Sequence, residues 1–416
     1  MAGCGAPAGA QICASDADCP GGTCHAIGPG VSYCAFADEA CESGERFGPQ
    51  SGGLSNVCVG GVRPDGGVDD DAPIMLVDAS TLDAPPGAEC FGTGLVRICL
   101  AAAPTVALNV TANQTINTDD MGMCTPVVGG TNIDACVLAG STVTIANGIM
   151  LRGTGGRPLV IVAQTTLMIG GTVDVASHRS PAQAGANSNF AQCANGTAAT
   201  YGGDSGGGGY GGSFGGRGGN GESNDGGNGG VSANASAAPT MLRGGCAGGA
   251  GGGTAGSAGR GGGAIYLIAK GALSVLATGR VNASGAGGVG GASGDRGAGG
   301  GGSGGMLGLD GVTVSIAAGG AVFANGGAGG EGGGDPGAGN PGGESLAGAA
   351  AAGGAGGVVP GGDGGGGSQG ATLTGGAAPG NADSQGGGGG AGGGGAGVIK
   401  LHGNVTNAGV VSPPAS

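Results

Sequence analysis

The sequence predicts a mainly β protein, in which a parallel β-solenoid or β-helix carries long glycine-rich arms and follows a small disulfide-rich N-terminal module. One observation is a short apolar pattern with period two that recurs along the chain, since such alternation places every second side chain on one face of a strand. The other is the composition, because 116 of 416 residues are glycine and only 2% are aromatic. With alanine and valine as the main apolar residues, the interior has to be narrow, as it is in a solenoid.

Four segments, which we call the repeats, carry the alternating pattern. The first spans 157–177, RPLVIVAQTTLMIGGTVDVAS, and joins the apolar run Leu159–Val162 to two alternating pairs around Gly170-Gly171, where the chain can turn a tight corner. The others begin at Gly263, Gly305 and Gly397. Strands this thin can bury an apolar face only against one another, which favours stacking of all four repeats.

We expect the repeats to pair as parallel strands, although long glycine-rich stretches separate them in the sequence. Their shared internal spacing places Leu159–Val162 beside Ile265–Ile268. In the same register, the pair Leu167/Ile169 lies beside Leu273/Val275. Antiparallel hairpins within each repeat would contradict this arrangement.

Thirteen cysteines beside only three histidines indicate disulfides and an oxidising compartment, and no metal site is predicted. Residues 1–59 form the predicted N-terminal module, with three bridges among Cys13, Cys19, Cys24, Cys34, Cys41 and Cys58. Four later cysteines permit three pairings, of which Cys90–Cys99 with Cys124–Cys136 is the simplest. Cys193 and Cys246 can then staple the first glycine-rich arm.

The remaining cysteine, Cys4, follows Met1-Ala2-Gly3, and small residues before a cysteine resemble the lipobox of bacterial lipoproteins. This resemblance implies a lipid-modified Cys4, a membrane as partner through that lipid, and a signal peptide encoded upstream of Met1. The alternative is that these small residues occur by chance. Setting Cys4 aside leaves an even number of cysteines in each segment of the chain, which favours lipidation.

The stretches SDADCPGGTC at 15–24 and YCAFADEACESGERFG at 33–48 resemble the Cys-rich N-terminal segments of myxobacterial surface lipoproteins. The resemblance covers only this module. It implies a location, at the outer-membrane surface or outside the cell, rather than an activity.

Residues 60–89 are predicted to be an acidic linker, because prolines and the run Asp69–Asp71 keep such a segment extended. Of the 27 acidic residues, 13 lie within the first 90 residues, so the folded body at 90–416 is close to neutral. No nucleic acid partner is expected, since no basic face is present. Strand-like segments between 90 and 153 are predicted to cap the stack and to supply its first strands.

Glycine-rich insertions at 178–262, 285–304 and 326–396 interrupt the body. Glycine takes every third position from 203 to 221 and again from 285 to 300. Period three matches the three residues per turn of a polyproline II helix, whose glycine edge lets neighbouring chains approach closely. We therefore expect arms packed as polyproline-II-like helices, with plain disorder as the alternative because glycine is costly to order.

Runs such as NGGAGG at 325–330 resemble the glycine-rich-repeat (PGRS-like) surface proteins of mycobacteria. The resemblance is one of composition, covers roughly 200–396, and implies exposure at the cell surface and interaction roles. The chain departs from that family because it lacks the helical N-terminal domain.

Several short motifs could carry chemistry, but each lacks the partners that the chemistry needs. Asp16 and Asp18 could offer oxygens to calcium, although turn carboxylates in water explain them as well. The serines in GDSGG at 203–207 and GGSGG at 301–305 lack a base and an orienting acid. The cluster 117–120 is similar to acid clusters of β-helical pectin-degrading enzymes, yet the expected histidine and basic partner are missing. No catalytic residue and no cofactor are predicted.

The function expected from these features is that of a cell-surface structural or adhesive protein, lipid-anchored or secreted, with a glycan or another surface component as partner. Two alternatives remain open. A polysaccharide-active β-helix enzyme would bring acids together on one face of the stack. A glycine-helix bundle that binds glycan or ice would need a flat, regular surface of Ala, Thr and Ser.

Overall fold

The computed structural model describes residues 13, 15–28, 31–39, 41, 43–48, 58–59, 87–131, 134–236, 239–253, 256–357, 361–380 and 387–416. The chain divides into two units, 1–81 and 82–416. Cys4 and residues 60–86 of the predicted linker lie outside the described residues.

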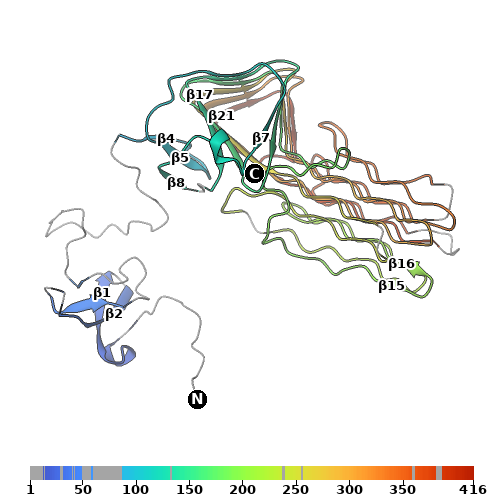
Figure 1. The fold of residues 1–416 in the computed structure, drawn as a ribbon, viewed down its shortest axis with the longest axis horizontal. Coiled ribbons are helices and arrows are strands. Elements are labelled where there is room, and N and C mark those ends of the chain that lie inside the picture. The colour runs from blue at the N-terminus through green and yellow to red at the C-terminus, as the bar shows by residue number, and fades with distance from the viewer. Residues whose placement is uncertain are drawn as a thin grey trace. The chain divides into compact units, whose positions relative to one another are not determined.

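The N-terminal unit is a three-stranded antiparallel sheet with a single 3₁₀ turn before it (Figure 1). Its elements are η1 (Asp16–Asp18), β1 (Gly22–Gly28), β2 (Val31–Ala37) and β3 (Glu45–Phe47). Three disulfides join Cys13 to Cys24, Cys19 to Cys34 and Cys41 to Cys58. Among the described residues of this unit, the buried cluster consists of cysteines, so the bridges stand in for an aliphatic core, as is usual in small domains.

The regular secondary structure of the second unit is almost entirely strand, and most of these strands lie in two parallel sheets. The larger sheet has eight strands: β6 (Leu108–Val110), β9 (Cys136–Gly140), β10 (Val143–Ile145), β12 (Leu159–Ala163), β13 (Leu167–Ile169), β17 (Ala264–Val275), β19 (Met306–Ile316) and β21 (Val398–Asn407). The smaller sheet has six: β7 (Gln114–Asn117), β11 (Met150–Thr154), β14 (Thr172–Asp174), β18 (Arg280–Asn282), β20 (Ala321–Phe323) and β22 (Val410–Ser412). Each repeat thus supplies strands to both sheets.

The predicted register of the repeats is confirmed. Leu159 to Val162 pair in parallel with Ile265 to Ile268. Leu167 and Ile169 pair with Leu273 and Val275. The later repeats continue the same ladder, from β17 to β19 and from β19 to β21. The segments before the first repeat supply β6, β7, β9, β10 and β11 to these two sheets, as expected.

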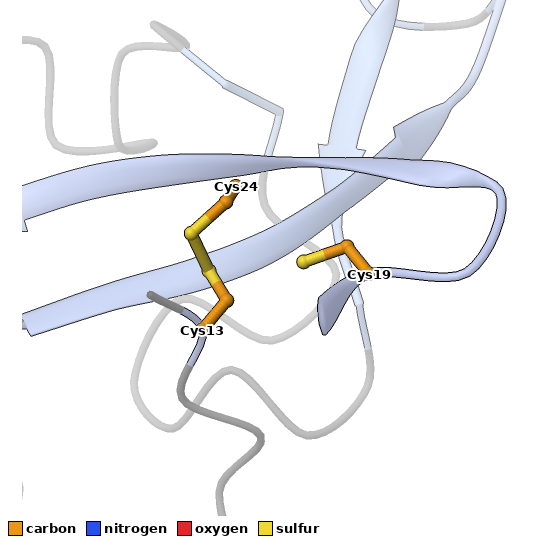
Figure 2. Close-up of side chains that lie close together, drawn as sticks. All are labelled: Cys13, Cys19 and Cys24. Carbon is orange, nitrogen blue, oxygen red and sulfur yellow. A yellow bond between two sulfur atoms is a disulfide. The ribbon is translucent and has the colours of Figure 1, made fainter. Parts of the chain in front are cut away.

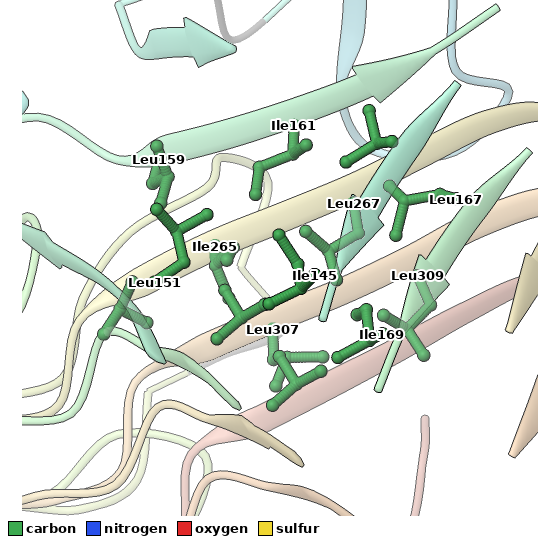
Figure 3. Packing of buried hydrophobic residues seen from close by; sticks show 14 of the residues in the cluster. Ile145, Leu151, Leu159, Ile161, Leu167, Ile169, Ile265, Leu267, Leu307 and Leu309 are labelled. Atoms are coloured by element: carbon green, nitrogen blue, oxygen red, sulfur yellow. The ribbon is translucent and has the colours of Figure 1, made fainter. Parts of the chain in front are cut away.

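The aliphatic core lies between the two sheets (Figure 3). In the larger sheet, Leu159, Ile265 and Leu307 are fully buried neighbours on adjacent strands. The labelled side chains in Figure 3 point toward one another, and they come from the first three repeats and from β10 and β11 before them. The alternating apolar side chains therefore face one interior that strands from distant segments share, as the period of two predicts.

A second apolar cluster covers the other face of one part of the larger sheet, over β9, β12 and the N-terminal parts of β17, β19 and β21. An antiparallel sheet of β4 (Glu89–Phe91), β5 (Arg97–Leu100) and β8 (Gly129–Thr131) supplies Phe91 and Ile98 to it. The first arm supplies Phe214 and Leu242. Because β4 begins at Glu89, that residue belongs to the folded body, whereas the sequence had suggested the linker. Glu89 is fastened there by an ion pair with Lys270.

The glycine-rich arms leave from the gaps between β14 and β17, β18 and β19, and β20 and β21. Figure 1 shows them as long extended segments that lie side by side, with the short hairpin β15 (Tyr201–Gly202) and β16 (Ser205–Gly206) at their far end. Outside these short pieces, the arms contain almost no assigned strand.

Backbone hydrogen bonds join the arms at every third residue. The N–H groups of Gly206, Gly209 and Gly212 donate to the carbonyls of Asp295, Ala298 and Gly301 at 2.8–2.9 Å. The carbonyls of the same three glycines accept from Gly389, Gly392 and Gly395 at 2.8–2.9 Å. Bonds from Ala298, Gly301 and Gly304 to Gly389, Gly392 and Gly395 close the triangle at 3.0–3.1 Å. The three arms are thus bonded to one another in step.

Glycine is required along these contacts because a side chain would meet the neighbouring backbone. A Cβ at Gly209 would lie 2.0 Å from the carbonyl oxygen of Gly249. A Cβ at Gly212 would lie 2.1 Å from the carbonyl oxygen of Cys246. Real Cβ atoms do not approach that closely, so the period of three in the sequence marks backbone-to-backbone packing.

The disulfides of the second unit are those that the sequence suggests. Cys90 pairs with Cys99, and Cys124 pairs with Cys136. Cys193 pairs with Cys246 across a sequence separation of 53 residues, within the first arm. Six disulfides in all indicate an oxidising, extracellular environment.

Candidate functional site

In the N-terminal unit, the sulfur atoms of Cys13, Cys19 and Cys24 lie within 4.8 Å of one another, the separation expected of metal ligands (Figure 2). All three are already bonded, Cys13 to Cys24 and Cys19 to Cys34, and a thiolate is what a metal would need. The nearby carboxylates are also engaged, since Asp16 accepts the Cys24 N–H at 2.7 Å and Asp18 accepts the Ser15 N–H at 2.9 Å. This grouping is a folded Cys module rather than a metal centre.

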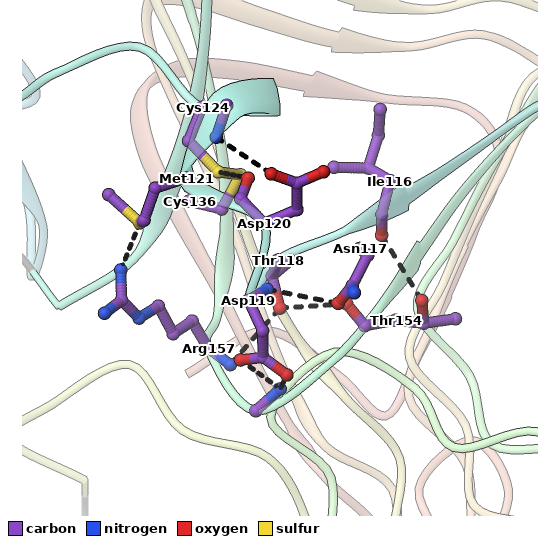
Figure 4. The surroundings of a disulfide bond; sticks show 12 residues. Ile116, Asn117, Thr118, Asp119, Asp120, Met121, Cys124, Cys136, Thr154 and Arg157 are labelled. Carbon is purple, nitrogen blue, oxygen red and sulfur yellow. Dashed lines mark hydrogen bonds between the residues drawn. A yellow bond between two sulfur atoms is a disulfide. The ribbon is translucent and has the colours of Figure 1, made fainter.

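The acidic cluster 117–120 forms a turn beside the Cys124–Cys136 bridge (Figure 4). Both carboxylate oxygens of Asp119 accept the backbone N–H of Gly156, at 2.9 and 2.8 Å. Asp120 accepts the N–H of Gly122 at 2.9 Å and so caps the 3₁₀ turn η3 (Met121–Met123). Asp119 thus joins two loops, and Asp120 caps a turn. These are the structural turn roles that the sequence favours over catalysis.

The serines of the two protease-like motifs make structural contacts. Ser205 Oγ donates to the carbonyl of Asn224 at 2.7 Å. Ser303 Oγ accepts the Cys246 N–H at 2.8 Å. Both serines are buried in the arms, and among the described contacts neither hydroxyl is bonded to a histidine or a carboxylate. Their surroundings do not provide the base that a serine nucleophile requires.

One polar cluster was not foreseen from the sequence. It joins Tyr266, Asp310 and His402 from three adjacent strands, β17, β19 and β21. The buried Asp310 carboxylate accepts three donors from the segment that covers it, Thr93 N–H, Thr93 Oγ and Gly94 N–H, at 2.7–2.9 Å. The cluster thereby ties the antiparallel sheet to the larger parallel sheet.

Gly94 packs directly over the other two members of this cluster. A Cβ there would lie 2.4 Å from the Tyr266 hydroxyl and 2.5 Å from His402 Nε2. Neither of these buried atoms has a hydrogen-bond partner at bonding geometry among the described residues. Burial raises the pKa of Tyr266, and the charge of Asp310 adds to this effect. The sequence did hold a signal for this cluster at one aligned strand position. The second repeat has Ile268 there, whereas the third and fourth repeats have the polar residues Asp310 and His402.

A regular surface feature is the outer side of one part of the larger parallel sheet, formed by β6, β10, β13 and the C-terminal parts of β17, β19 and β21, which we call the hydroxyl face. Its first row consists of residues in register on six adjacent strands: Asn109, Thr144, Met168, Ser274, Ser315 and Thr406. Two positions earlier, a second row holds Ala272, Thr313 and Asn404, also in register. All of these side chains are exposed or half-buried, and none is charged.

The hydroxyl face alternates with the buried core along each strand. Residues between its members, such as Val143, Leu167 and Val314, point inward and are fully buried. Across the strands, Ser315 Oγ donates to Ser274 Oγ at 3.0 Å. Adjacent strands lie about 4.8 Å apart, and residues two positions apart on a strand about 6.6 Å apart. The face therefore presents mostly small polar groups on a repeating grid, with Met168 and Ala272 as its apolar members.

A charged cluster fastens the third arm to the repeats. His178 Nε2 lies 3.0 Å from an Asp174 carboxylate oxygen, and Nδ1 lies 2.8 Å from a Glu344 carboxylate oxygen. Hydrogen bonds to Asp174 and Glu344 raise the pKa of His178 to about 9. Asp174 is also paired with buried Arg152 at 2.5 Å, and the Arg179 N–H donates to Glu344. With both ring nitrogens donating, His178 is a cationic link between the first repeat and the third arm.

No family model matches this chain, and comparisons with curated proteins and with solved structures give no significant match either. Among the described residues, no helix is long and apolar enough to span a membrane.

Proposed function

We propose that the protein is a cell-surface structural or adhesive protein that acts through an extended face rather than a pocket. The observation that carries this proposal is the hydroxyl face, a regular grid of uncharged, exposed or half-buried side chains on a parallel sheet. A regular grid offers many weak contacts in parallel, which suits attachment to a repetitive surface by multivalency.

The finer architecture that we propose is a β-solenoid with arms built as polyproline-II-like helices. Parallel strands in one register across four repeats support the solenoid. Hydrogen bonds in steps of three support the arms, since a polyproline II helix has three residues per turn and directs its amides outward to neighbours. Such a stack would be a stiff rod that extends from the solenoid and adds reach to a surface protein.

The location that we propose is the outer-membrane surface or the cell exterior. The disulfides support an oxidising compartment, and a lipidated Cys4 would attach the chain to the membrane, with residues 60–89 as tether. The resemblance of the Cys module to myxobacterial surface lipoproteins, and of the arms to mycobacterial glycine-rich surface proteins, leads to the same proposal.

The adhesive role is tested with a glycan array and with intact producing cells. Protease treatment of whole cells should release peptides of the arms, and purified protein should bind repetitive glycans. Replacement of Ser274 and Ser315 together by Lys should abolish binding by placing two charges on the grid. Leu346→Lys is the matched control, because Leu346 is 69% exposed in the third arm, away from the face. Binding that survives the double replacement would contradict the role of the hydroxyl face.

A second candidate function is binding to ice, which the regular spacing of the same face favours. Ordered water presents a lattice of donors and acceptors, and rows of hydroxyl groups at fixed spacing can meet such a lattice without charge. Measurement of ice recrystallisation with the wild-type chain and the same two variants separates the two functions. Inhibition by the wild-type chain without glycan binding would establish the second candidate in place of the first.

A further inference from the structure

The disulfide between Cys193 and Cys246 lies against a cationic side chain. Arg243 Nη2 lies 3.4 Å from the sulfur of Cys193 and 3.2 Å from the sulfur of Cys246. Cys246 is buried, whereas Cys193 is half-buried. A guanidinium group thus touches both sulfurs of a bond of which one end can be reached from solvent.

Arg243 is a buried cation with neutral neighbours. Its guanidinium lies between the rings of Phe190 and Phe214, 4.7 and 4.5 Å from their centroids, and Nε donates to the carbonyl of Gly244 at 3.2 Å. No carboxylate of the described residues forms an ion pair with it. Burial lowers the pKa of Arg243, as expected for a charge removed from water. A negative charge created beside it would be strongly stabilised.

We propose that the Cys193–Cys246 bond is a thiol–disulfide exchange site, at which an external thiol bonds to Cys193 and Cys246 leaves as a thiolate beside Arg243. The electron pair of the incoming thiolate forms a new bond to the Cys193 sulfur. The electron pair of the breaking S–S bond stays with the Cys246 sulfur, which becomes a thiolate. The proton of the incoming thiol goes to solvent. The incoming thiol is thereby oxidised to a mixed disulfide, and Cys246 is reduced.

The direction of attack follows from exposure and charge. Exchange is faster when the attacked sulfur is accessible and when the leaving thiol has a lowered pKa. A nearby cation lowers a thiol pKa, so Arg243 favours departure of Cys246. Cys90–Cys99 is an internal comparison, since Cys90 is half-buried and Cys99 fully buried, while no described Lys or Arg contact reaches either sulfur.

The exchange would act on the packing of the arms. The Cys246 N–H donates to Ser303 Oγ at 2.8 Å, and its carbonyl accepts the Ser303 N–H at 2.9 Å. Cys246 is therefore bonded to the segment before β19, where the first arm meets the second. A thiol from outside would become covalently attached to the first arm at the moment when the closure of that arm is released.

The test uses the full oxidised chain and reduced glutathione. After brief exposure at pH 8, thiols are blocked with N-ethylmaleimide and each cysteine is assigned by mass spectrometry. We expect glutathione on Cys193 and maleimide on Cys246. Exchange at this bridge should be about threefold faster than exchange at Cys90–Cys99. Glutathione mainly on Cys246, or equal rates at the two bridges, would overturn the proposal.

Variants of Arg243 test the role of the cation. Arg243→Met should slow the exchange by about threefold or more, and Arg243→Lys, which keeps the charge, should lie between the two. Arg217→Met is the matched control, because Arg217 lies in the same arm and bonds Ser232 instead of a sulfur. If Arg243→Met does not fold, the exchange rates of the wild type and Arg243→Lys are compared instead. Equal exchange rates for these two chains would contradict the dependence on the guanidinium.

Discussion

The repeats and the arms are both ordered by stacking, but they are stabilised by different parts of the chain. In the repeats, side chains such as Leu267 and Ile265 fill a shared interior, and the backbone pairs along the ladder. In the arms the interior consists of backbone, because glycine lets three segments approach until their amides and carbonyls bond directly. The comparison teaches that one chain can build an apolar core and a polar core side by side.

The two kinds of core should respond differently to change. An apolar core is weakened by loss of volume, since transfer free energy and packing are lost together. A glycine core has no volume to lose and is weakened by any added atom. Closure by a disulfide should also matter more to the arms, because an unfolded glycine-rich chain has more conformational freedom than any other.

The largest effect is expected from removal of the bridge in the first arm. Cys193→Ser with Cys246→Ser removes a closure across 53 residues, worth about 4 kcal/mol in the chain-entropy model. Limited proteolysis with trypsin should then cut near Arg217 or Arg243 while the repeats stay folded. Cys90→Ser with Cys99→Ser should leave these sites protected. Equal cleavage with and without the bridge would mean that the arm does not depend on it.

A smaller effect, now on the whole second unit, is expected in the apolar core. Leu267 is fully buried between the sheets, so Leu267→Ala should lower the free energy of unfolding by about 3 kcal/mol. Denaturant titration measures the change. Leu346→Ala removes the same atoms from a residue that is 69% exposed and should change stability by less than about 0.5 kcal/mol. A similar loss in both variants would show that the interior of the repeats is not tightly packed.

Addition of one methyl group tests the glycine core. Gly209→Ala places a carbon 2.0 Å from the Gly249 carbonyl oxygen, so the segments must separate, at a cost of about 1–3 kcal/mol. Hydrogen exchange should accelerate at the amides of Gly212 and Gly392. Gly348→Ala is the control, since a Cβ at Gly348 meets nothing within 4 Å. Unchanged exchange in Gly209→Ala would contradict the close packing of the arms.

The smallest effect concerns the pH dependence of the link at His178. The pKa of His178 is raised from 6.5 to about 9, so its contribution to stability is complete below about pH 6.5 and is lost as the pH rises through about 9. Burial alone would raise the pKa of Glu344, but bonds from His178 and Arg179 hold it below 4.5, which preserves the link in mild acid. Proteolysis of the third arm should therefore accelerate above pH 9.

His178→Gln separates this titration from others at high pH. The variant should show faster proteolysis of the third arm already at pH 7, with little further change up to pH 10. The amide keeps hydrogen-bonding capacity without a charge, so the difference between the two chains reports the cationic state of His178. Parallel pH profiles for wild type and variant would exclude the link.

Much of the fold was predictable because the signals in this sequence are periodic. Alternation of Leu167, Ile169, Val173 and Val175 identifies strands, and equal spacing in later repeats predicts the register that is observed. Even cysteine counts leave three pairings open between residues 90 and 136, and the structure has the simplest of them, Cys90–Cys99 with Cys124–Cys136. The period of three in glycine marks the arms, since only backbone contact on one edge requires glycine at that interval.

The candidate sites depended on contacts between residues far apart in the sequence. The sequence by itself determined the strands, the pairing of the repeats and the positions where glycine is indispensable, because each follows from a local period. Tertiary structure alone decided that Asp310 bonds Thr93, that His178 joins Asp174 to Glu344, and that Arg243 lies against a disulfide. Those contacts depend on how arms of unequal length fold back onto the sheets, and no period in the sequence records where two such segments meet.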